Sequence, residues 1–186
     1  MTILVDMDDT IEQLLAALVR KANERFCRSV TVDEITDWTI VCAYPGLEKQ
    51  QILELMYEPG FWDTVEPVPG AADALKYLMD EGHQVYIVTA TEFENVPAKM
   101  ERVLFRYFPF LSRDQVIITG NKQMIRGDVL IDDGIHNLEG GEYRKILFDA
   151  GHNRLFDEKT VGAVRVRGWD EAYREVCRIA RETENR

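Results

Sequence analysis

Residues 3–10 read Ile-Leu-Val-Asp-Met-Asp-Asp-Thr, an aliphatic run followed directly by two carboxylates, Asp6 and Asp8, in a D-x-D spacing. Such a run is typical of a buried parallel strand, whose carboxyl end forms the usual ligand edge of an α/β sheet. Two aspartates there can divide the work of phosphoryl transfer, because Asp6 can attack phosphorus while Asp8 shuttles the proton of the leaving alcohol. The triplet alone is a weak signal, since a carboxylate pair after a strand is often only a turn or a helix cap.

The composition limits the classes of partner. The chain has 186 residues, 46% of them hydrophobic, which fits one globular domain with a small insertion. Its formal net charge is −11 and it has no basic run, so a nucleic-acid polymer or an acidic membrane surface would be repelled. A small phosphate ester remains compatible, because a divalent cation and one or two lysines reverse the local field.

The three cysteines, Cys27, Cys42 and Cys177, are odd in number and far apart in the sequence, which argues against a disulfide framework or a zinc site. This pattern of cysteines favours a location of the protein in the reducing cytoplasm. Only three aliphatic residues precede Asp6, so we expect no signal peptide, and no apolar run approaches the length of a membrane span.

The segment after the first strand has a helical pattern. Thr10-x-x-Gln13 predicts a capping box, and apolar residues from Ile11 to Phe26 fall on one face of a helix. Short helical stretches are expected at 32–35 and 47–58, separated by Pro45-Gly46. We interpret residues 15–68 as a small helical cap inserted between the first strand and the rest of the sheet.

From Pro69 onward, helical and strand patterns alternate, which indicates a parallel sheet. The predicted helices are 70–81, 95–108 and a C-terminal amphipathic helix from Trp169. The predicted strands are 84–89, 116–119, 128–131, 145–148 and 163–166. The catalytic core is therefore expected to comprise residues 1–14 and 69–186.

Three further groups lie at strand ends or in loops on the same edge of the predicted sheet. Thr89 ends one strand, Lys122 lies in the next loop, and Asp132-Asp133 end another strand. A hydroxyl, an ammonium and two hard carboxylates suit a phosphate group and Mg²⁺. Each residue alone has an ordinary structural explanation, but their convergence on one crevice is a much rarer coincidence.

A phosphorelay receiver domain uses the same residue types, namely an acidic pair, a phospho-acceptor aspartate, a threonine and a lysine. In that domain the acidic pair opens the chain, whereas here Asp132-Asp133 follow both Thr89 and Lys122. An inserted cap also has no use in a signalling module. The order of the motifs therefore argues against a receiver.

Asp6-x-Asp8, Thr89, Lys122 and Asp132-Asp133 resemble the four motifs of the haloacid dehalogenase superfamily of phosphatases. Within it, the segments 60–71 and 122–133, followed by Ile146-Leu147-Phe148, resemble the 5'(3')-deoxyribonucleotidase family. The similarity covers nearly the whole chain and is loose at 27–58. It implies a three-layer α/β/α core of Rossmann-like type, with a parallel sheet and a small helical cap after the first strand.

The resemblance also implies roles for individual residues. Asp6 would be the nucleophile and Asp8 the general acid and base. Mg²⁺ would be held by Asp6, the main-chain carbonyl of Asp8 and Asp132, with Asp133 beside them. The phosphate would be contacted by Thr89, Ala90, Lys99 and Lys122. Phe61 and Trp62 match an aromatic pair that shapes the nucleoside pocket in the family, and packing of the cap onto the core is the alternative for these rings.

Two positions depart from the family pattern. Ala90-Thr91 replace a frequent Ser-Pro, so a backbone N–H or Thr91 must supply the lost donor. Asp9 replaces a frequent Gly, which is tolerable because Asp is among the better non-glycine residues in a left-handed turn. Neither departure affects the nucleophile, but both weaken the transfer of substrate preference.

The sequence thus predicts a Mg²⁺-dependent phosphomonoesterase for nucleoside monophosphates, deoxyribonucleotides above all, working through an aspartyl-phosphate. A phosphatase of another small ester, such as a sugar phosphate, is the nearest alternative. A non-catalytic nucleotide-binding module is less compatible with Asp6 and Asp8 together. A homodimer is compatible with the sequence, which does not fix the oligomeric state.

Overall fold

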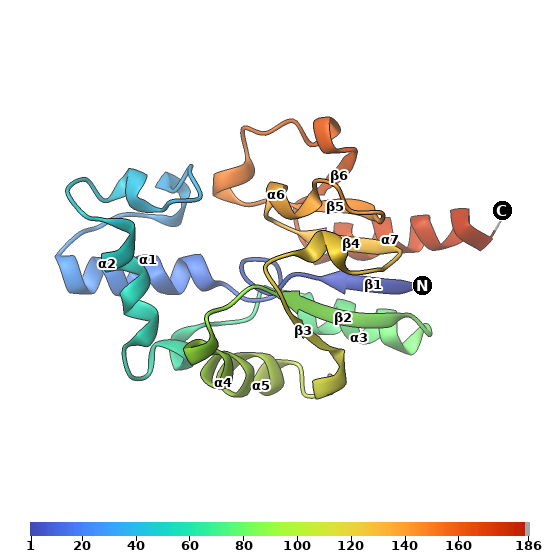
Figure 1. Ribbon diagram of the computed structural model, residues 1–186, viewed down its shortest axis with the longest axis horizontal. Helices are drawn as coiled ribbons and strands as arrows, with labels where there is room; N and C mark the ends of the chain where they lie inside the picture. Colours follow the sequence, from blue (N-terminus) through green and yellow to red (C-terminus); the bar gives the residue numbers. More distant parts are fainter. Residues whose placement is uncertain (185–186) are drawn as a thin grey trace.

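A computed structural model describes residues 1–184 and confirms the α/β class. Its centre is a six-stranded sheet in the order β3-β2-β1-β4-β5-β6, in which every neighbouring pair is parallel (Figure 1). The strands are β1 (Thr2–Val5), β2 (Gln84–Thr89), β3 (Val116–Ile118), β4 (Val129–Asp132), β5 (Arg144–Phe148) and β6 (Ala163–Val166). The sheet order places β1, which carries the D-x-D motif, between β2 and β4.

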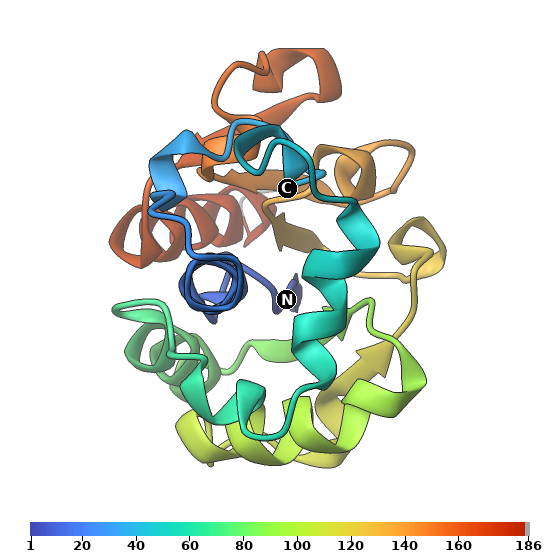
Figure 2. The ribbon, with the colours of Figure 1, turned by 90° about the vertical axis from the view of Figure 1, so that its left-hand side faces the viewer.

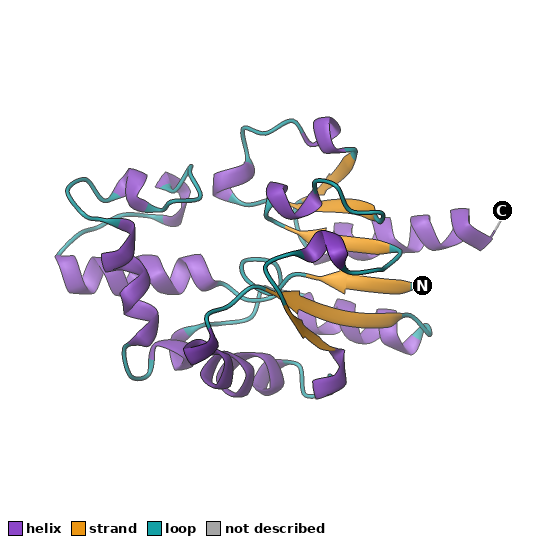
Figure 3. Cartoon of the chain, in the orientation of Figure 1, coloured by secondary structure: helices purple, strands orange, loops and turns teal. Residues whose placement is uncertain are grey.

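Side chains alternate between the two faces of the sheet, as the two-residue period of a strand requires. Ile3 and Val5 of β1 belong to the larger hydrophobic cluster, which includes residues of α3 and α7. Leu4 belongs to a second cluster with Leu130 of β4 and Leu138 of α6. The helices therefore cover both faces of the sheet (Figure 3).

The helices agree with most of the predicted ranges. The α-helices are α1 (Leu14–Phe26), α2 (Lys49–Leu53), α3 (Ala71–Asp80), α4 (Val96–Lys99), α5 (Phe105–Tyr107), α6 (Ile135–Leu138) and α7 (Trp169–Glu184). A π-helical turn, Met100–Leu104, joins α4 to α5, so the helix predicted at 95–108 is one continuous segment with a widened middle. The helix predicted at 47–58 is α2 followed by a 3₁₀ turn, Glu54–Tyr57.

The predicted capping box at Thr10 is wrong. Helix α1 begins at Leu14, and Gln13 precedes it without a side-chain cap. The Gln13 side chain instead donates to the carbonyl of Pro67 at 2.9 Å, and its backbone N–H donates to Glu66 at 2.9 Å. Residues 11–13 are thus tied to the returning chain at 66–68, which keeps Ile11 out of the helix.

The segment that contains α1 and α2 lies beyond the ends to which the strand arrows point in Figure 1, and Figure 2 views the molecule from that side. Those arrow ends are the carboxyl ends of the parallel strands, where Asp6, Thr89 and Asp132 lie. We propose that this segment acts as the cap expected at 15–68. None of the helices within residues 1–184 combines the length and the apolar character that crossing a membrane requires.

Candidate active site

The adjacent strands β2, β1 and β4 deliver the first three site residues. Thr89 is the last residue of β2, Asp6 directly follows β1, and Asp132 is the last residue of β4. All three side chains are buried. The sheet therefore brings together a hydroxyl and two carboxylates that lie far apart in the sequence.

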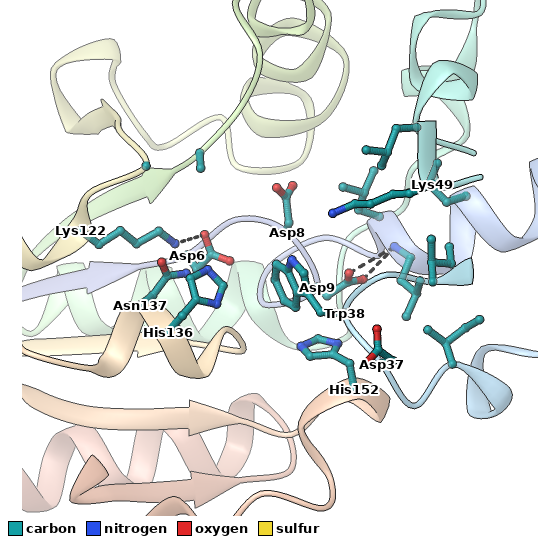
Figure 4. A pocket seen from close by; sticks show the side chains of 18 residues that line it. Asp6, Asp8, Asp9, Asp37, Trp38, Lys49, Lys122, His136, Asn137 and His152 are labelled. Carbon is teal, nitrogen blue, oxygen red and sulfur yellow. Dashed lines mark hydrogen bonds and ion pairs between the residues drawn. The ribbon is translucent and has the colours of Figure 1, made fainter. Parts of the chain in front are cut away.

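Lys122 joins the two carboxylates. It begins the 3₁₀ turn Lys122–Met124, and its ammonium contacts Asp6 (Figure 4). The same ammonium lies 2.7 Å from Oδ2 of Asp132. Burial alone would lower the pKa of Lys122, but the attraction of the two carboxylates outweighs burial and raises it. Lys122 is therefore a fixed positive charge beside the predicted nucleophile.

The loop after β4 holds Asp132 and Asp133 in place. Oδ1 of Asp132 accepts hydrogen bonds from the Gly134 N–H at 2.7 Å and from the side-chain amide of Asn137 at 3.0 Å. Oδ2 of Asp133 lies 3.2 Å from Nε2 of His152. The other carboxylate oxygen of Asp133 has no hydrogen-bond partner within residues 1–184.

The carboxylates of Asp6, Asp132 and Asp133 form a cluster that suits a metal ion. One ligand atom from each lies within 4.8 Å of the others, and all three side chains are buried. Burial and the neighbouring negative charges raise the pKa of Asp6 and of Asp133. A divalent cation relieves that repulsion, and hard carboxylate oxygens are the ligands that Mg²⁺ prefers. The residues present therefore fit a bound cation.

Asp8 lies on the other flank, paired with Lys99. The Lys99 ammonium is 2.5 Å from Oδ1 of Asp8 and donates to Oγ1 of Thr89 at 3.0 Å. Burial raises the pKa of Asp8, but the attraction of Lys99 outweighs it, and the net pKa is lowered. Lys99, expected from the family resemblance to contact phosphate, thus reaches the site from the end of α4.

Glu12 was not identified from the sequence as a buried residue next to the site. Its side chain is fully buried, and a short backbone bridge pairs it with Asp8. Burial and the negative charge of Asp8 raise the pKa of Glu12. Glu12 is buried because residues 11–13 pair with residues 66–68. The local sequence around Glu12 gives no sign of this pairing, so its burial could not be predicted.

The aromatic pair Phe61 and Trp62 is packed inside the protein. The two side chains are 2% and 5% exposed, and their rings meet edge to face at 5.4 Å between centroids. The indole N–H of Trp62 donates to Oδ1 of Asn95 at 3.3 Å, and the Lys99 ammonium lies 5.8 Å from the Trp62 ring. Trp62 lines a pocket together with Asp8 and Lys99. In the described structure, this pair joins the segment before Val65 to the core.

A different aromatic residue, Trp38, faces the cavity that contains Asp6 and Asp8. Its side chain is 51% exposed, and its ring meets His152 at 4.6 Å and His136 at 5.1 Å, edge to face in both cases (Figure 4). Sequence reasoning missed Trp38 because the stretch around it lacks helical or strand periodicity. The available sign of a functional role was the presence of a tryptophan in a stretch without such periodicity.

Ala90 and Lys49 also line this cavity. Ala90 directly follows Thr89, which places its backbone N–H at the strand end where a phosphate donor was predicted. Lys49 opens α2, and Figure 4 shows its side chain extending into the cavity from the side opposite Lys122. The cavity is thus lined by cations from two directions and by carboxylates at its base.

Comparison with known proteins places this geometry in a family. A family model described as 5' nucleotidase, deoxy (pyrimidine), cytosolic type C protein matches residues 1–182. The chain belongs to this family. A 5'(3')-deoxyribonucleotidase of Bacillus subtilis (strain 168) is 36% identical over 176 residues, covering 94% of this chain and 97% of its own. A protein of the same name from Clostridium acetobutylicum is 32% identical over 171 residues, covering 92% of each chain.

Solved structures of other hydrolases share the fold of this chain. A haloacid dehalogenase family hydrolase from Deinococcus radiodurans R1, crystallised with bound phosphate and sodium, superposes with a TM-score of 0.68 at 12% identity, covering 96% of each chain. A structure titled putative phosphoglycolate phosphatase, from Lactobacillus delbrueckii, gives a TM-score of 0.63 at 18% identity, covering 94% of this chain and 97% of its own. The chain therefore has the fold of a haloacid dehalogenase family hydrolase, and its own family identifies it as a phosphoric monoester hydrolase whose substrate is a small phosphate ester.

Proposed function

We propose that this enzyme is a Mg²⁺-dependent phosphomonoesterase that hydrolyses nucleoside monophosphates, deoxyribonucleotides in particular, through an aspartyl-phosphate on Asp6. The observation that carries the proposal is that Asp6, Asp8 and the exposed ring of Trp38 line one cavity. An ester whose leaving alcohol carries a flat aromatic base makes use of all three. The names of the family and of the Bacillus subtilis relative support the deoxynucleotide class.

The first step is transfer of the phosphoryl group to the enzyme. A carboxylate oxygen of Asp6 attacks phosphorus, and the ester P–O bond breaks as the new P–O bond forms. The leaving oxygen takes a proton from the carboxyl of Asp8 and departs as an alcohol. In the free enzyme Lys99 favours the ionised form of Asp8, and the arrival of a phosphate dianion, a like charge, favours uptake of the required proton.

The second step is hydrolysis of the aspartyl-phosphate. Asp8, now a carboxylate, removes a proton from water, and the hydroxide attacks phosphorus. The bond between phosphorus and the Asp6 oxygen breaks, which releases phosphate and restores both aspartates. One residue thus serves as acid in the first step and as base in the second.

Positive charges and donors around the phosphate lower the barrier to both steps. Lys122 is held beside Asp6, while Lys99 and the Thr89 hydroxyl lie together on the Asp8 side. The backbone N–H of Ala90 supplies a further donor in place of the hydroxyl that the family often has. Preorganised groups of this kind stabilise the charge that develops on the equatorial oxygens.

Asp6, the main-chain carbonyl of Asp8 and Asp132 would hold Mg²⁺, with Asp133 beside them. The bound ion would neutralise charge on the phosphate and on the carboxylate cluster. The buried Asp133 oxygen, which has no partner among the described residues, is the feature of this site that most favours cation binding.

The test is phosphate release from a panel of purified esters in buffer with Mg²⁺. The panel contains the deoxyribonucleoside 5'- and 3'-monophosphates, the matching ribonucleotides, several sugar phosphates and phosphoglycolate. The proposal requires kcat/KM for a deoxynucleotide to exceed that for every sugar phosphate by at least about tenfold, equivalent to 1.4 kcal/mol. Preference for a sugar phosphate or phosphoglycolate would replace the nucleotide assignment.

A further inference from the structure

Asn153 is a buried polar side chain to which the proposed reaction assigns no role. It ends the 3₁₀ turn Gly151–Asn153, which follows β5, and it is 0% exposed. Its amide nitrogen donates to the carbonyl of Asp133 at 2.9 Å and to the carbonyl of Phe148 at 2.8 Å. Both N–H donors of the amide are therefore used, and one of them holds a residue of the carboxylate cluster.

The two carbonyls lie at the carboxyl ends of neighbouring strands. In the parallel pairing of β4 with β5, Asp132 is the last residue of β4 in register, and its partner is Leu147. Asp133 and Phe148 are the next residues along the two segments. The Asn153 amide thus joins the two segments one step beyond the end of their ladder. The position of Asp133 therefore depends on this side chain as well as on the strand that precedes it.

Arg165 holds the Asn153 side chain from the other side. It lies on β6, and its guanidinium donates to Oδ1 of Asn153 and to Oδ1 of Asp149, at 2.7 Å in both cases. It also donates to the carbonyls of Asn153, at 3.1 Å, and of Phe156, at 2.8 Å. Because a guanidinium can only donate, the oxygen of the amide must face Arg165 and its nitrogen must face the two carbonyls. A third strand thus fixes the orientation of the Asn153 amide.

Asp133 benefits from this support because its carboxylate belongs to the candidate cation site. One of its ligand atoms lies within 4.8 Å of those of Asp6 and Asp132. Ionised carboxylates at such a separation repel one another, and the repulsion favours rotation of Asp133 away from the cluster. Asn153 holds Asp133 through its main chain. It can therefore oppose this rotation while the carboxylate oxygens stay available to a cation.

We propose that Asn153 and Arg165 form a positioning pair, which holds the main chain of Asp133 so that its carboxylate stays beside Asp6 and Asp132 to bind a divalent cation. The inference rests on the proposed function, from which it takes the cation. Residues that orient a metal ligand without touching the metal typically contribute about 10- to 100-fold to metal affinity. Loss of Asn153 should therefore weaken cation binding even where the fold survives.

The experiment measures binding of Mg²⁺ by titration calorimetry without substrate, for the wild type and two variants. Asn153→Leu keeps the branched shape and the neutral charge of the side chain but cannot donate to Asp133. Arg165→Lys keeps the positive charge but cannot form the fork of hydrogen bonds that holds Asn153. Circular dichroism and the melting temperature in chelator report on folding.

Asn23→Leu is the matched control. The Asn23 amide also holds a loop, because it donates to the carbonyl of Val30 at 2.7 Å and accepts from the N–H of Val30 at 3.0 Å. Asn23 lies on α1, outside the cavity that contains Asp6. Its replacement therefore removes a comparable pair of hydrogen bonds away from the cation site.

We expect Asn153→Leu to raise the Kd for Mg²⁺ by about 10- to 100-fold, and Arg165→Lys to raise it by at least about threefold. Asn23→Leu should lower the melting temperature and leave this Kd within about twofold of the wild-type value. A lower melting temperature of Asn153→Leu with an unchanged Kd would show a purely structural role and overturn the inference. Equal weakening of Mg²⁺ binding in Asn23→Leu would also overturn it, because it would reveal a general loosening of the protein. If Asn153→Leu does not fold, Arg165→Lys alone decides, and an unchanged Kd in that variant overturns the inference.

The outcome for the proposed function is separate. If the wild-type enzyme binds Mg²⁺ but hydrolyses a sugar phosphate in preference to nucleotides, the substrate assignment is wrong, while the comparison of Kd values still tests Asn153. If the wild-type enzyme binds no Mg²⁺, the proposed metal dependence is wrong and the role of Asn153 fails with it.

Discussion

The ammonium of Lys99 lies 2.5 Å from Oδ1 of Asp8, and only 1% of the lysine side chain is exposed. A buried lysine is tolerated when opposite charges surround it, and here Asp8 and Glu12 raise its pKa against the lowering effect of burial. The same ammonium donates to Thr89, at the end of β2. Lys99 therefore connects the predicted proton shuttle to the predicted phosphate site and contributes to the stability of both.

Replacement of Lys99 by Met should destabilise the protein and reduce turnover. The change leaves Asp8 without its counter-charge, and breaking one side of a buried pair costs about 3–5 kcal/mol. Urea denaturation measures the stability, and phosphate release measures the turnover. Lys76→Met is the control, because the pair of Lys76 with Asp80 is nearly as short, 2.7 Å, but exposed, and should contribute less than about 1 kcal/mol. Equal losses in the two variants would show that burial of Lys99 has no energetic consequence.

Asp6→Asn should abolish turnover and leave the fold intact. The amide is nearly isosteric with the carboxylate but cannot form an acyl phosphate, so kcat should fall by at least about 10³-fold. It also removes one negative charge from a cluster that raises the pKa of Asp6, so the free energy of unfolding without metal should not decrease. Phosphate release and urea denaturation measure the two quantities. An Asn variant that keeps a tenth of wild-type activity would exclude the covalent mechanism.

Removal of the metal should have the same effect as loss of Asp132. We expect a chelator to abolish phosphate release, Mg²⁺ to restore it, and Asp132→Asn to weaken Mg²⁺ binding more than about tenfold in titration calorimetry. Asp114→Asn, at an exposed aspartate outside the cavity, is the control for a change of one charge. Turnover that persists in excess chelator would remove the cation from the reaction.

The sequence predicted the features that depend on local pattern and strand order. Aliphatic runs that end in Asp6, Thr89 and Asp132 were sufficient to infer a parallel sheet and a site at its carboxyl edge. The structure brings these residues together with Lys122, and the strands at 84–89 and 163–166 have the predicted bounds. Such features follow from the periodicity of the hydrophobic residues and from the usual position of ligands in α/β sheets, and a single sequence is enough to apply both rules.

Other features depend on contacts between distant segments. Glu12 is buried because residues 11–13 pair with 66–68, and the same pairing disrupts the capping box that Thr10 and Gln13 would otherwise form. Trp38 reaches the cavity through an irregular segment, where no periodicity specifies direction. The order β3-β2-β1-β4-β5-β6 likewise reflects packing of the whole sheet. Local sequence patterns carry no information about these pairings.

Asp9→Asn should stabilise the metal-free protein at pH 8 but not at pH 4. Burial raises the pKa of Asp9 to about 7, even though the hydrogen bond from the Leu15 N–H, 2.9 Å long, lowers it. A raised carboxyl pKa gives stability that is full below the ordinary value of 3.8 and is lost as the pH rises towards 7. Asn stays neutral throughout, can accept the same hydrogen bond and tolerates the left-handed φ of 53° at this position.

Urea denaturation of both proteins in chelator, between pH 4 and pH 8, measures the Asp9 effect. The difference in free energy of unfolding should be close to zero at pH 4 and should increase steadily up to about pH 7. A difference that stays constant with pH would mean that Asp9 ionises in the folded protein as readily as in the unfolded chain.

Trp38→Ala should reduce binding of nucleotides and leave small esters almost unaffected. If the exposed ring stacks on the base, its loss should cost about 1–3 kcal/mol of nucleotide binding, which is about 5- to 150-fold in KM. Nitrophenyl phosphate and other small esters that occupy only the Asp6 end should change little.

Trp62→Phe is the matched aromatic control. Because Trp62 is 5% exposed and donates to Asn95, its replacement should lower the melting temperature and affect all esters alike. If Trp38→Ala weakens all esters equally while Trp62→Phe selectively weakens nucleotides, then Trp62, as its sequence motif suggested, contacts the nucleoside and Trp38 serves only to cover the cavity.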